Sequence, residues 1–288
     1  MQRVLILVNP EKPLAREVAD SLCPWVRQRA EVRTMDLSDE PVEPEADLVV
    51  VLGGDGSLLK AARMLGGREM PVVGINLGKL GYMAEFSAEA FCEQFEAIAA
   101  GETPVSRRLM LRVRCETGDG RSEYLVLNEV LVAGGDAHRV TGVRATIDEE
   151  AITTYFGDGV LVSTPTGSTA YCMAAGGPLL APGLAAMVLV PVCPHSLTHR
   201  PIVLRPECEI VLEPTDLQKE AVCVVDGQTR VRLRPGDRVS IGRADSSFLL
   251  VERSHRKPFE TLSRKLHWGH LPRYQDREGT QGQRDKGT

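Results

Sequence analysis

Apolar and polar positions follow two different patterns along the chain, and the change comes near residue 104. Before it, short and mostly continuous apolar runs alternate with longer segments whose apolar residues recur at helical spacing. Continuous apolar runs are typical of strands buried on both faces of a parallel sheet. The predicted strands are 4–8, 31–35, 48–52 and 71–76, and the predicted helices are 14–29, 57–63 and 88–100. The pattern predicts an α/β domain with a parallel sheet over residues 1–104, with Pro24 as a break point in the first helix.

Beyond residue 104, short segments with alternating apolar and polar positions are separated by Gly, Pro and Asp. Many such segments at this spacing are typical of an antiparallel β domain. The predicted strands are 109–115, 124–132, 143–147, 160–163, 202–204, 209–212, 221–225, 230–233 and 239–243. We therefore expect a C-terminal antiparallel β-rich domain over residues 105–257.

The last part of the chain holds one more amphipathic segment. Apolar residues at helical spacing predict a terminal helix over about 258–268, which we expect to pack back on the α/β domain. Residues 270–288 are polar and lack core-forming side chains, so we expect a disordered tail.

Composition narrows the partners and the location. The 288 residues are 43% hydrophobic and 25% charged, as in globular proteins. The net charge of −5 and the lack of a basic run argue against nucleic acid as a partner. No segment approaches the ~20 apolar residues of a membrane span, and the first residues are typical of a core strand rather than a signal peptide. Seven scattered cysteines without a C-x-x-C pair disfavour structural zinc and favour a cytoplasmic location.

The most informative stretch, residues 46–63, is an apolar strand, a Gly-Gly-Asp-Gly turn and an amphipathic helix. Glycine permits the tight turn, and Ser57 is placed to cap the helix. Free N–H groups at the start of that helix form an anion site. Asp55 lies within this site, which makes chemical sense if its carboxylate takes up a proton or holds a cation. The alternative is an ordinary βα turn in which Asp55 helps to cap the helix.

A second stretch, residues 157–171, leads from a strand into a turn that is dense in hydroxyl groups. Its Ser and Thr side chains and backbone N–H groups suit ribose hydroxyls, an adenine edge or phosphate oxygens. Asp158, just ahead of the strand, is placed to accept from a ligand amide or amine. The alternative is a loop folded by local Ser and Thr turns.

Polar residues inside apolar segments are further candidates. Asn128 and Glu129 lie within a predicted strand, so one of them points inward and requires a partner, either a ligand or a neighbouring backbone group. Residues 226–228 lie between two predicted strands and are typical of a hairpin turn, with Gln228 as a candidate ligand contact.

Several common site motifs are absent. The phosphate loop G-x-x-x-x-G-K-[ST] has no match, because the stretch 74–79 is one residue short and is followed by Leu80. The dinucleotide motif G-x-G-x-x-G fails because Leu59 occupies the third glycine position, and no G-x-S-x-G elbow occurs. His195 and His199 lack an adjacent third ligand, so we expect no metal site there.

Taken together, these motifs resemble the NAD kinase family, from about residue 4 to residue 269. The matching stretches, in the family's order, are GGDGS (53–57), GINLGKLGY (74–82), LNEVLV (127–132), DGVLVSTPTGSTAY (158–171), CPHSLTHRPIVL (193–204), VDGQ (225–228) and KLHWG (265–269). The GGDG element alone is shared with lipid kinases and phosphofructokinase-like enzymes, whereas the 158–171 stretch is much more specific.

The resemblance implies a two-domain NAD kinase-like fold. It also implies transfer of a phosphate from ATP, or from polyphosphate, to the 2′-hydroxyl of the adenosine ribose of NAD, giving NADP. Asp55 would be the general base, and Mg²⁺ or another divalent cation would accompany ATP and neutralise the transferring group. No protein residue is assigned as a metal ligand. The residues placed in the substrate site are Asp55, Gly56, Asn128, Glu129, Arg139, Asp158, Thr169, Ala170, Tyr171, Cys172, Met173, Ala174 and Gln228.

Two positions depart from the family pattern. Ser57 replaces a more usual Thr, and because both hydroxyls can cap a helix or bind phosphate, we expect little change. Phe156 stands where some members carry a basic residue that contacts the ligand, so that contact is not carried over to this chain. The family is usually oligomeric and neighbouring subunits help to complete the NAD site, so a homodimer or homotetramer is expected.

Two alternatives stay open at the level of the sequence. A lipid kinase of the diacylglycerol or sphingosine type would share the GGDG element, but no motif indicates a lipid-accommodating cleft or a membrane-facing surface. The other alternative is a non-catalytic NAD(H)-binding regulator, against which the intact Asp55 argues.

Overall fold

The computed structural model describes residues 2–38, 40, 42, 45–78, 81–135, 140–215, 220–253, 262–263 and 265–266. The chain forms two compact units, Met1–Ser254 and His255–Thr288. The first unit holds every helix and strand named below. In the second unit, the described residues of the predicted terminal helix are helical: Leu262, Ser263, Lys265 and Leu266. The rest of that predicted helix, and the predicted tail over 270–288, lie outside the described residues.

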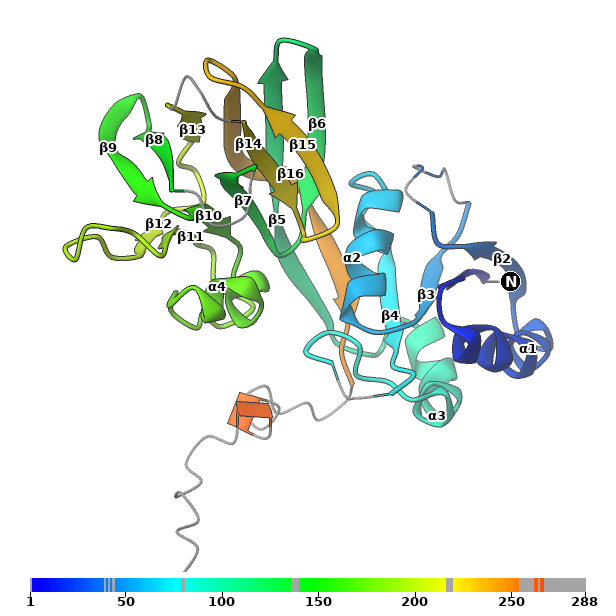
Figure 1. Cartoon of the computed structure of the whole chain (residues 1–288). Helices are drawn as coiled ribbons and strands as arrows, with labels where there is room; N and C mark the ends of the chain where they lie inside the picture. The colour runs from blue at the N-terminus through cyan, green and yellow to red at the C-terminus, as the bar shows by residue number, and fades with distance from the viewer. Residues whose placement is uncertain are drawn as a thin grey trace, which may run out of the picture. The chain divides into compact units, whose positions relative to one another are not determined.

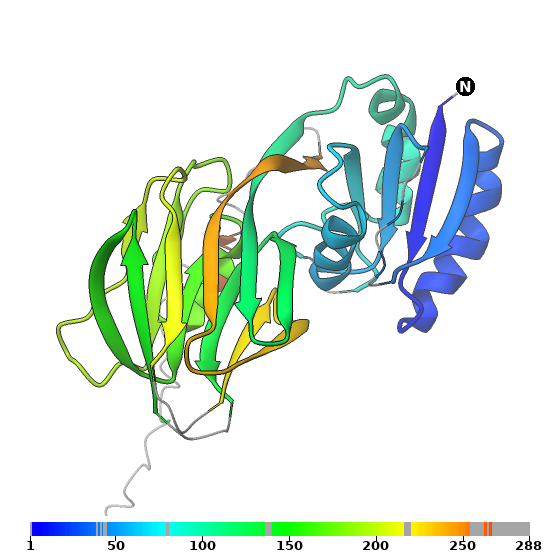
Figure 2. The same cartoon turned by 90° about the horizontal axis from the view of Figure 1, so that it is seen from above.

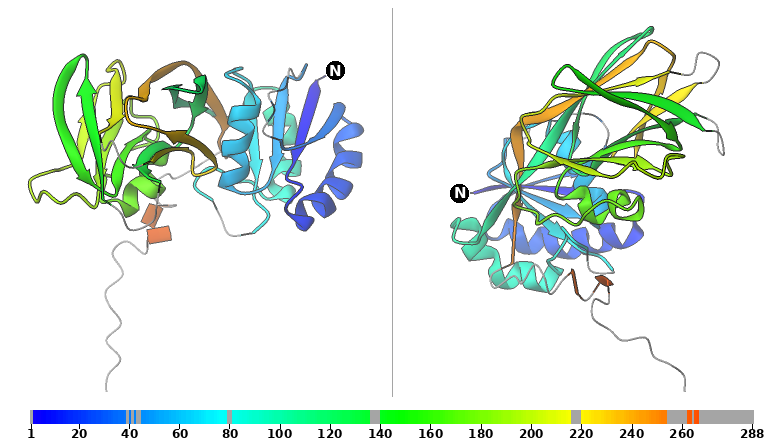
Figure 3. Two further views of the ribbon diagram at one scale, coloured as in Figure 1. Left: turned by 45° about the horizontal axis from the view of Figure 1, so that its top comes forward. Right: turned by 90° about the vertical axis from the view of Figure 1, so that its left-hand side faces the viewer.

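The N-terminal part is a parallel sheet between helices. Its strands pair in the order β2-β1-β3-β4, and successive residues of each strand point to opposite faces, which explains the continuous apolar runs. Helices α1 and α3 pack on one face and α2 packs on the other (Figure 3). The bounds are β1 (Arg3–Val8), α1 (Pro13–Arg27), β2 (Glu31–Asp36), β3 (Leu48–Leu52), α2 (Asp55–Met64), β4 (Pro71–Ile75) and α3 (Ala88–Ala99). The predicted α/β arrangement is confirmed.

Helix α1 continues through Pro24, so the predicted break at this residue is wrong. Proline removes one backbone hydrogen bond, which usually interrupts a helix. On either side of it, Leu22, Cys23 and Val26 are buried against the sheet. Tertiary packing of this face therefore offsets the missing bond.

The long strand β16 (Arg238–Val251) connects the two parts of the fold. It pairs in parallel with β4 near its end, and antiparallel with β5 (Val105–Thr117) and β13 (Ile210–Pro214) along the rest of its length. One sheet therefore runs in the order β2-β1-β3-β4-β16-β13-β8-β9, with β5 also on β16 and β6 on β5 (Figures 1 and 2). Its remaining strands are β6 (Gly120–Val126), β8 (Thr141–Ile147) and β9 (Glu150–Gly157).

A second, antiparallel sheet packs against the C-terminal half of the first, in the order β12-β11-β10-β7-β14-β15. Its strands are β7 (Glu129–Gly134), β10 (Gly159–Ser163), β11 (Met187–Val192), β12 (Ile202–Leu204), β14 (Ala221–Val225) and β15 (Thr229–Leu233). Fully buried residues of both sheets, among them Val113, Ile241, Val132 and Leu189, form one core. The predicted antiparallel β-rich C-terminal part is confirmed.

The structure corrects the predicted strands at several places. The single strand predicted over 124–132 is two strands, β6 and β7, separated by a bend at 127–128. The bend arises because the Asp226 carboxylate accepts the backbone N–H groups of Leu127 and Asn128, which are thereby withdrawn from a ladder. Strands β9 and β11 are additional to the predicted set, and β16 extends well beyond the predicted 239–243.

Candidate functional site

The turn between β3 and α2 is tighter than the sequence suggests. Helix α2 begins at Asp55, with Gly54 as its N-cap. A Cβ atom at Gly53 would collide with the Ser57 side chain, so glycine is required there. The prediction that Ser57 caps the helix is wrong: Ser57 is buried inside the first turn, where its Oγ accepts a hydrogen bond of 2.9 Å from Asn9 Nδ2. The two glycines let the helix start earlier than the serine.

Asp55 turns its carboxylate toward a second loop. Its Oδ2 accepts a bond of 2.8 Å from the Tyr82 amide, and its Oδ1 accepts bonds of 3.0 Å from the Met83 and Ala84 amides. A Cβ at Gly81 would collide with this carboxylate, so the close approach of the two loops requires glycine. The glycine loop after β4 is therefore the partner of the GGDG turn. The Asp55 carboxylate bonds to this loop and has no side-chain capping role in its own helix.

Asn128 lies in the bend before β7, and Glu129 is the first residue of that strand. Both are buried to about the same degree, so the prediction that only one of them points inward is wrong. In the part of the chain that the structure describes, Asn128 Oδ1 and Glu129 Oε2 are buried without a hydrogen-bond partner. A buried acceptor without a donor is destabilising by about 1–3 kcal/mol. Such atoms are suited to a ligand that brings hydroxyl or amide donors, as a ribose does.

Asp226 holds the backbone of Asn128 and Glu129 in place through hydrogen bonds to its carboxylate. It lies in the hairpin turn between β14 and β15, as predicted, with φ values of 48° at Asp226 and 66° at Gly227. Its buried carboxylate accepts backbone N–H groups from Leu127 (3.1 Å), Asn128 (2.8 Å) and Glu129 (3.2 Å). The turn residue is therefore a structural anchor for the start of β7.

The same cluster contains two perturbed carboxyl groups. Burial raises the pKa of Glu129 to about 8, and the neighbouring Asp226 charge adds to the effect. Burial also raises the pKa of Asp226 to about 6, against the lowering effects of the three amides and of Arg63. Glu129 is therefore mainly neutral at pH 7, and its carboxyl can donate a hydrogen bond as well as accept one.

Gln228 connects this cluster to the helix that begins with Asp55. Its Nε2 donates a bond of 3.0 Å to the Gly56 carbonyl, and its Oε1 accepts one of 2.6 Å from Arg63 Nη2. Arg63 Nη1 also lies 3.9 Å from Asp226 Oδ2. The sequence prediction included Gln228 but missed the side chains of Arg63 and Asp226. Its only signal for Asp226 was an acid in a turn after an apolar strand.

Most hydroxyls of the 157–171 stretch fold the loop. Thr164 Oγ1 donates to the Leu127 carbonyl (2.6 Å), Ser168 Oγ donates to the Pro165 carbonyl (2.7 Å), and Ser163 Oγ bonds to backbone carbonyls. A Cβ at Gly167 would collide with the Asn128 backbone. The loop is thus wrapped over Asn128. The Ser168 bond is local, as in the alternative raised for this stretch, whereas Thr164 and Ser163 also anchor the loop to the distant carbonyls of residues 127 and 128.

The residues predicted to follow in the substrate site lie on the short helices η1 (Gly167–Thr169) and α4 (Tyr171–Ala174). Thr169 Oγ1 bonds to the Thr166 carbonyl at 3.3 Å. The Tyr171 side chain is exposed, whereas Cys172 is fully buried in a cluster with residues of β10 and β11. The Cys172 side chain is therefore part of the hydrophobic core, and neighbouring residues such as Tyr171 form the exposed surface of this segment.

Asp158 is not brought together with Asn128 and Glu129. It is exposed and precedes β10, whereas Glu129 pairs with Ser163 at the far end of that strand. The strand rise places these two ends about 13 Å apart. The Asp158 side chain instead lies beside Cys193, whose thiol pKa it raises. Arg139 lies outside the described residues.

Within the described residues, no group of three or more His, Cys, Asp or Glu side chains is arranged to hold a metal ion. No helix among them is both long and apolar enough to cross a bilayer.

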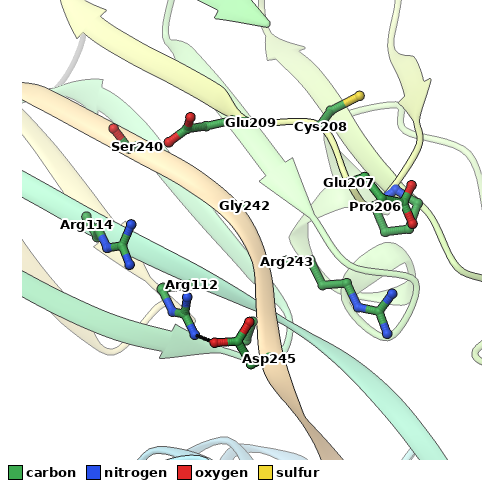
Figure 4. Close-up of a pocket in the computed structure, with 11 residues that line it drawn as sticks. Arg112, Arg114, Pro206, Glu207, Cys208, Glu209, Ser240, Gly242, Arg243 and Asp245 are labelled. Atoms are coloured by element: carbon green, nitrogen blue, oxygen red, sulfur yellow. Dashed lines mark hydrogen bonds and ion pairs between the residues drawn. The ribbon is translucent and has the colours of Figure 1, made fainter. Parts of the chain in front are cut away.

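A hollow of about 500 Å³ lies elsewhere, on the outer face of the first sheet (Figure 4). Strands β5 and β16 and the segment before β13 line it, and it shares no residue with the cluster around Asp55. Arg112 is paired with Asp245 and faces Glu123, and Arg114 is paired with Glu123 as well. Two of its three arginines, Arg112 and Arg114, are neutralised by carboxylates, and Glu207 and Glu209 also line the hollow, which disfavours an anion there.

Models of known protein families match the chain over most of its length. The model described as "ATP-NAD kinase N-terminal domain" matches residues 32–103, and the one described as "ATP-NAD kinase C-terminal domain" matches residues 127–253. The NAD kinase of Geobacter metallireducens is 36% identical over 281 residues, which cover 93% of this chain and 99% of that protein. The NAD kinase of Heliobacterium modesticaldum is 37% identical over 283 residues, with coverages of 93% and 100%.

Solved structures share the fold. Yeast NADH kinase complexed with NADH superposes with a TM-score of 0.85 at 24% identity, covering 94% of this chain and 89% of its own. An NAD kinase from Archaeoglobus fulgidus in complex with ATP gives a TM-score of 0.74 at 26% identity, with coverages of 92% and 98%.

Proposed function

The chain belongs to the NAD kinase family, and we propose that it transfers the γ-phosphate of ATP to the 2′-hydroxyl of the adenosine ribose of NAD, giving NADP. The observation that carries this proposal is a short path between two groups of side chains. Gln228 bonds to Gly56, the neighbour of Asp55. Two residues before Gln228, Asp226 holds the amide of Asn128. The carboxylate of Asp55 can accept a proton, and the buried side-chain oxygens of Asn128 and Glu129 can accept hydrogen bonds from ribose hydroxyls. The hairpin turn at 226–228 is hydrogen-bonded to the backbone beside both groups.

Membership of this family makes the chain a phosphotransferase. It does not favour the two alternatives from the sequence, a lipid kinase or a non-catalytic regulator.

Asp55 would act as the general base. A carboxylate offers about four lone-pair positions, and the three amide bonds at Asp55 leave one of them, on Oδ2, for the ribose hydroxyl. As the 2′-oxygen attacks the γ-phosphorus, its proton passes to Asp55 and ADP leaves with the electrons of the broken P–O bond. The loop 81–84 keeps the carboxylate aimed during this step.

The start of α2 would hold the donor phosphates. Its free N–H groups and the bare backbone of Gly54 and Gly56 favour anions. The site also fits a divalent cation such as Mg²⁺ that is held through the substrate phosphates and water, since magnesium usually keeps several waters and is bound together with such phosphates. The one open lone pair of Asp55 is then left for the ribose hydroxyl. Bound there, the cation would neutralise charge on the transferring phosphate. Polyphosphate has the same phosphate chemistry and is the alternative donor.

The acceptor site would be formed by the start of β7 and the segment that wraps over it. Asn128 and Glu129 would accept from ribose hydroxyls through their buried, unpartnered oxygens. The further residues that we propose to line the NAD site are Thr169, Ala170, Tyr171, Cys172, Met173, Ala174, Gln228, Asp158 and Arg139.

A homodimer or homotetramer would explain two other features. Phe156 on β9 and Val203 on β12 are large, exposed apolar residues on the edge strands of the two sheets, and Leu197 lies exposed nearby in the chain. Asp158 is adjacent to this surface and distant from Glu129, so it would serve the site of a neighbouring subunit. The seven free cysteines suit the reducing cytoplasm, which we propose as the location.

NADP formation by the purified protein with NAD, ATP and Mg²⁺ tests the function, read by an NADP-specific dehydrogenase. We expect turnover that disappears with EDTA. Turnover with polyphosphate but not with ATP would support NAD as the phosphate acceptor and show that polyphosphate, not ATP, is the donor. A folded protein that binds NAD but forms no NADP with any donor would refute the proposal.

A further inference from the structure

Arg63 is an unusual residue for the end of a surface helix. Its side chain is only 10% exposed, and the Asp226 side chain that it faces is fully buried. Removing a guanidinium and a carboxylate from water is costly, yet Arg63 Nη1 and Asp226 Oδ2 lie 3.9 Å apart in the protein interior. A role that requires a buried charge at this place explains the arrangement better than helix stability does.

The geometry links Arg63 to both halves of the proposed site. Its Nη2 donates to Gln228 Oε1, while Gln228 Nε2 donates to the Gly56 carbonyl. Gly56 and Arg63 lie about two turns apart on the same face of α2. The hairpin turn is therefore bound to the helix at two points, one of them adjacent to Asp55.

The positive charge of Arg63 acts on Asp226, the first residue of the hairpin turn that also contains Gln228. Asp226 holds the amides of residues 127–129 and so fixes the side chains of Asn128 and Glu129. Among the described residues, the charged and titratable groups that face Asp226 are Arg63 from α2 and Glu129 from β7. Arg63 is the cation that favours the ionised form of this carboxylate.

We propose that Arg63 is a positioning residue for phosphoryl transfer: it locks the helix that carries Asp55 onto the turn that holds Asn128 and Glu129. The inference rests on the proposed function, because it concerns the alignment of that function's base with its acceptor. Arg63 would act through Gln228 and Asp226 rather than by contact with a substrate.

The test compares Arg63→Met with Arg63→Lys and with Arg16→Met, in which an arginine of an exposed ion pair with Asp36 is removed. Arg63→Met is expected to lower kcat about 100-fold, the scale associated with misplacement of reacting groups, while KM for NAD changes far less. Lysine keeps the charge but lacks the fork that reaches Gln228 and Asp226 together, so Arg63→Lys should restore part of kcat. Arg16→Met should behave as the unaltered protein.

The pH profile separates positioning from a loss of folded protein. Without the guanidinium, Asp226 takes up a proton at a higher pH, so the acid limb of kcat/KM in Arg63→Met should move to higher pH. In Arg63→Lys the limb should stay in place. A merely structural role would lower the amount of active protein without moving the limb.

Unchanged kcat and pH profile in a folded Arg63→Met protein would overturn the inference. If Arg63→Met does not fold, Arg63→Lys decides. A kcat per mole of folded protein equal to that of the unaltered protein would overturn the inference. A lower kcat per mole of folded protein would support it, because a loss of folded protein alone leaves that quantity unchanged. Failure of the unaltered protein to form NADP would instead refute the proposed function.

Discussion

Asp55 and Asp226 present the same side chain to the same kind of partner, yet the two regions around them differ. Each carboxylate accepts three backbone N–H groups from consecutive residues of another segment. Asp55 is partly exposed, at the start of a helix and beside a glycine loop. Asp226 is buried and faces Arg63.

The difference shows that the degree of burial gives two aspartate carboxylates different roles. The Asp226 region has its lone pairs taken by amides and its charge balanced by a guanidinium, so it serves as an anchor. The Asp55 region keeps a lone pair open toward a surface where a substrate can approach. An equal number of amide donors therefore does not imply an equal role.

The largest expected effect comes from Asp55→Asn. The amide side chain cannot take the proton of the ribose hydroxyl, and loss of a general base lowers the rate by about 10²–10⁴-fold. NADP formation should fall by that factor, while NAD binding, measured by calorimetry, stays within about threefold because Asn128 and Glu129 are unaltered. Unchanged turnover in the folded variant would remove Asp55 from the role of base and with it the contrast to Asp226.

Asp226→Ala should act mainly on stability. The substitution leaves the amides of residues 127–129 and the Arg63 guanidinium without their buried acceptor. Breaking one partner of a buried charge pair destabilises a protein by about 3–5 kcal/mol, which denaturant unfolding can measure. The control is Asp245→Ala, whose exposed pair with Arg112 contributes about 0–1 kcal/mol. Equal effects of the two substitutions would contradict the anchor role.

The smallest effect is a pH dependence of stability from Glu129. Its pKa is raised in the folded protein to about 8, so the folded state binds more protons than the unfolded state between its ordinary value and pH 8. The free energy of unfolding should therefore decrease as the pH rises through this window, by about 1 kcal/mol per pH unit. Asp226, raised to about 6, contributes in the same direction below that pH.

Glu129→Gln isolates this contribution, because the amide does not titrate. Its unfolding free energy should be nearly flat between pH 6 and 8, whereas that of the unaltered protein falls. Parallel curves for the two proteins would mean that Glu129 does not bind its proton in this range.

Much of the fold follows from local patterns. The continuous run at 48–52 and the alternation at 230–233 are confirmed as the doubly buried β3 and the edge strand β15. Patterns fail where a tertiary contact overrides them. The bend at 127–128 depends on Asp226, and the early start of α2 depends on the collision that only glycine at position 53 avoids.

The sequence by itself determined the family, through motifs that occur in a set order, and it named residues of the proposed site, including Asp55, Asn128, Glu129 and Gln228. Only the tertiary structure decided which of them meet. It separates Asp158 from Glu129, places the loop 81–84 on Asp55, and joins Arg63 to Gln228 across 165 positions of the chain. The physical reason is that periodicity reports which face of a segment is apolar, whereas the pairing of buried charges depends on how distant segments pack.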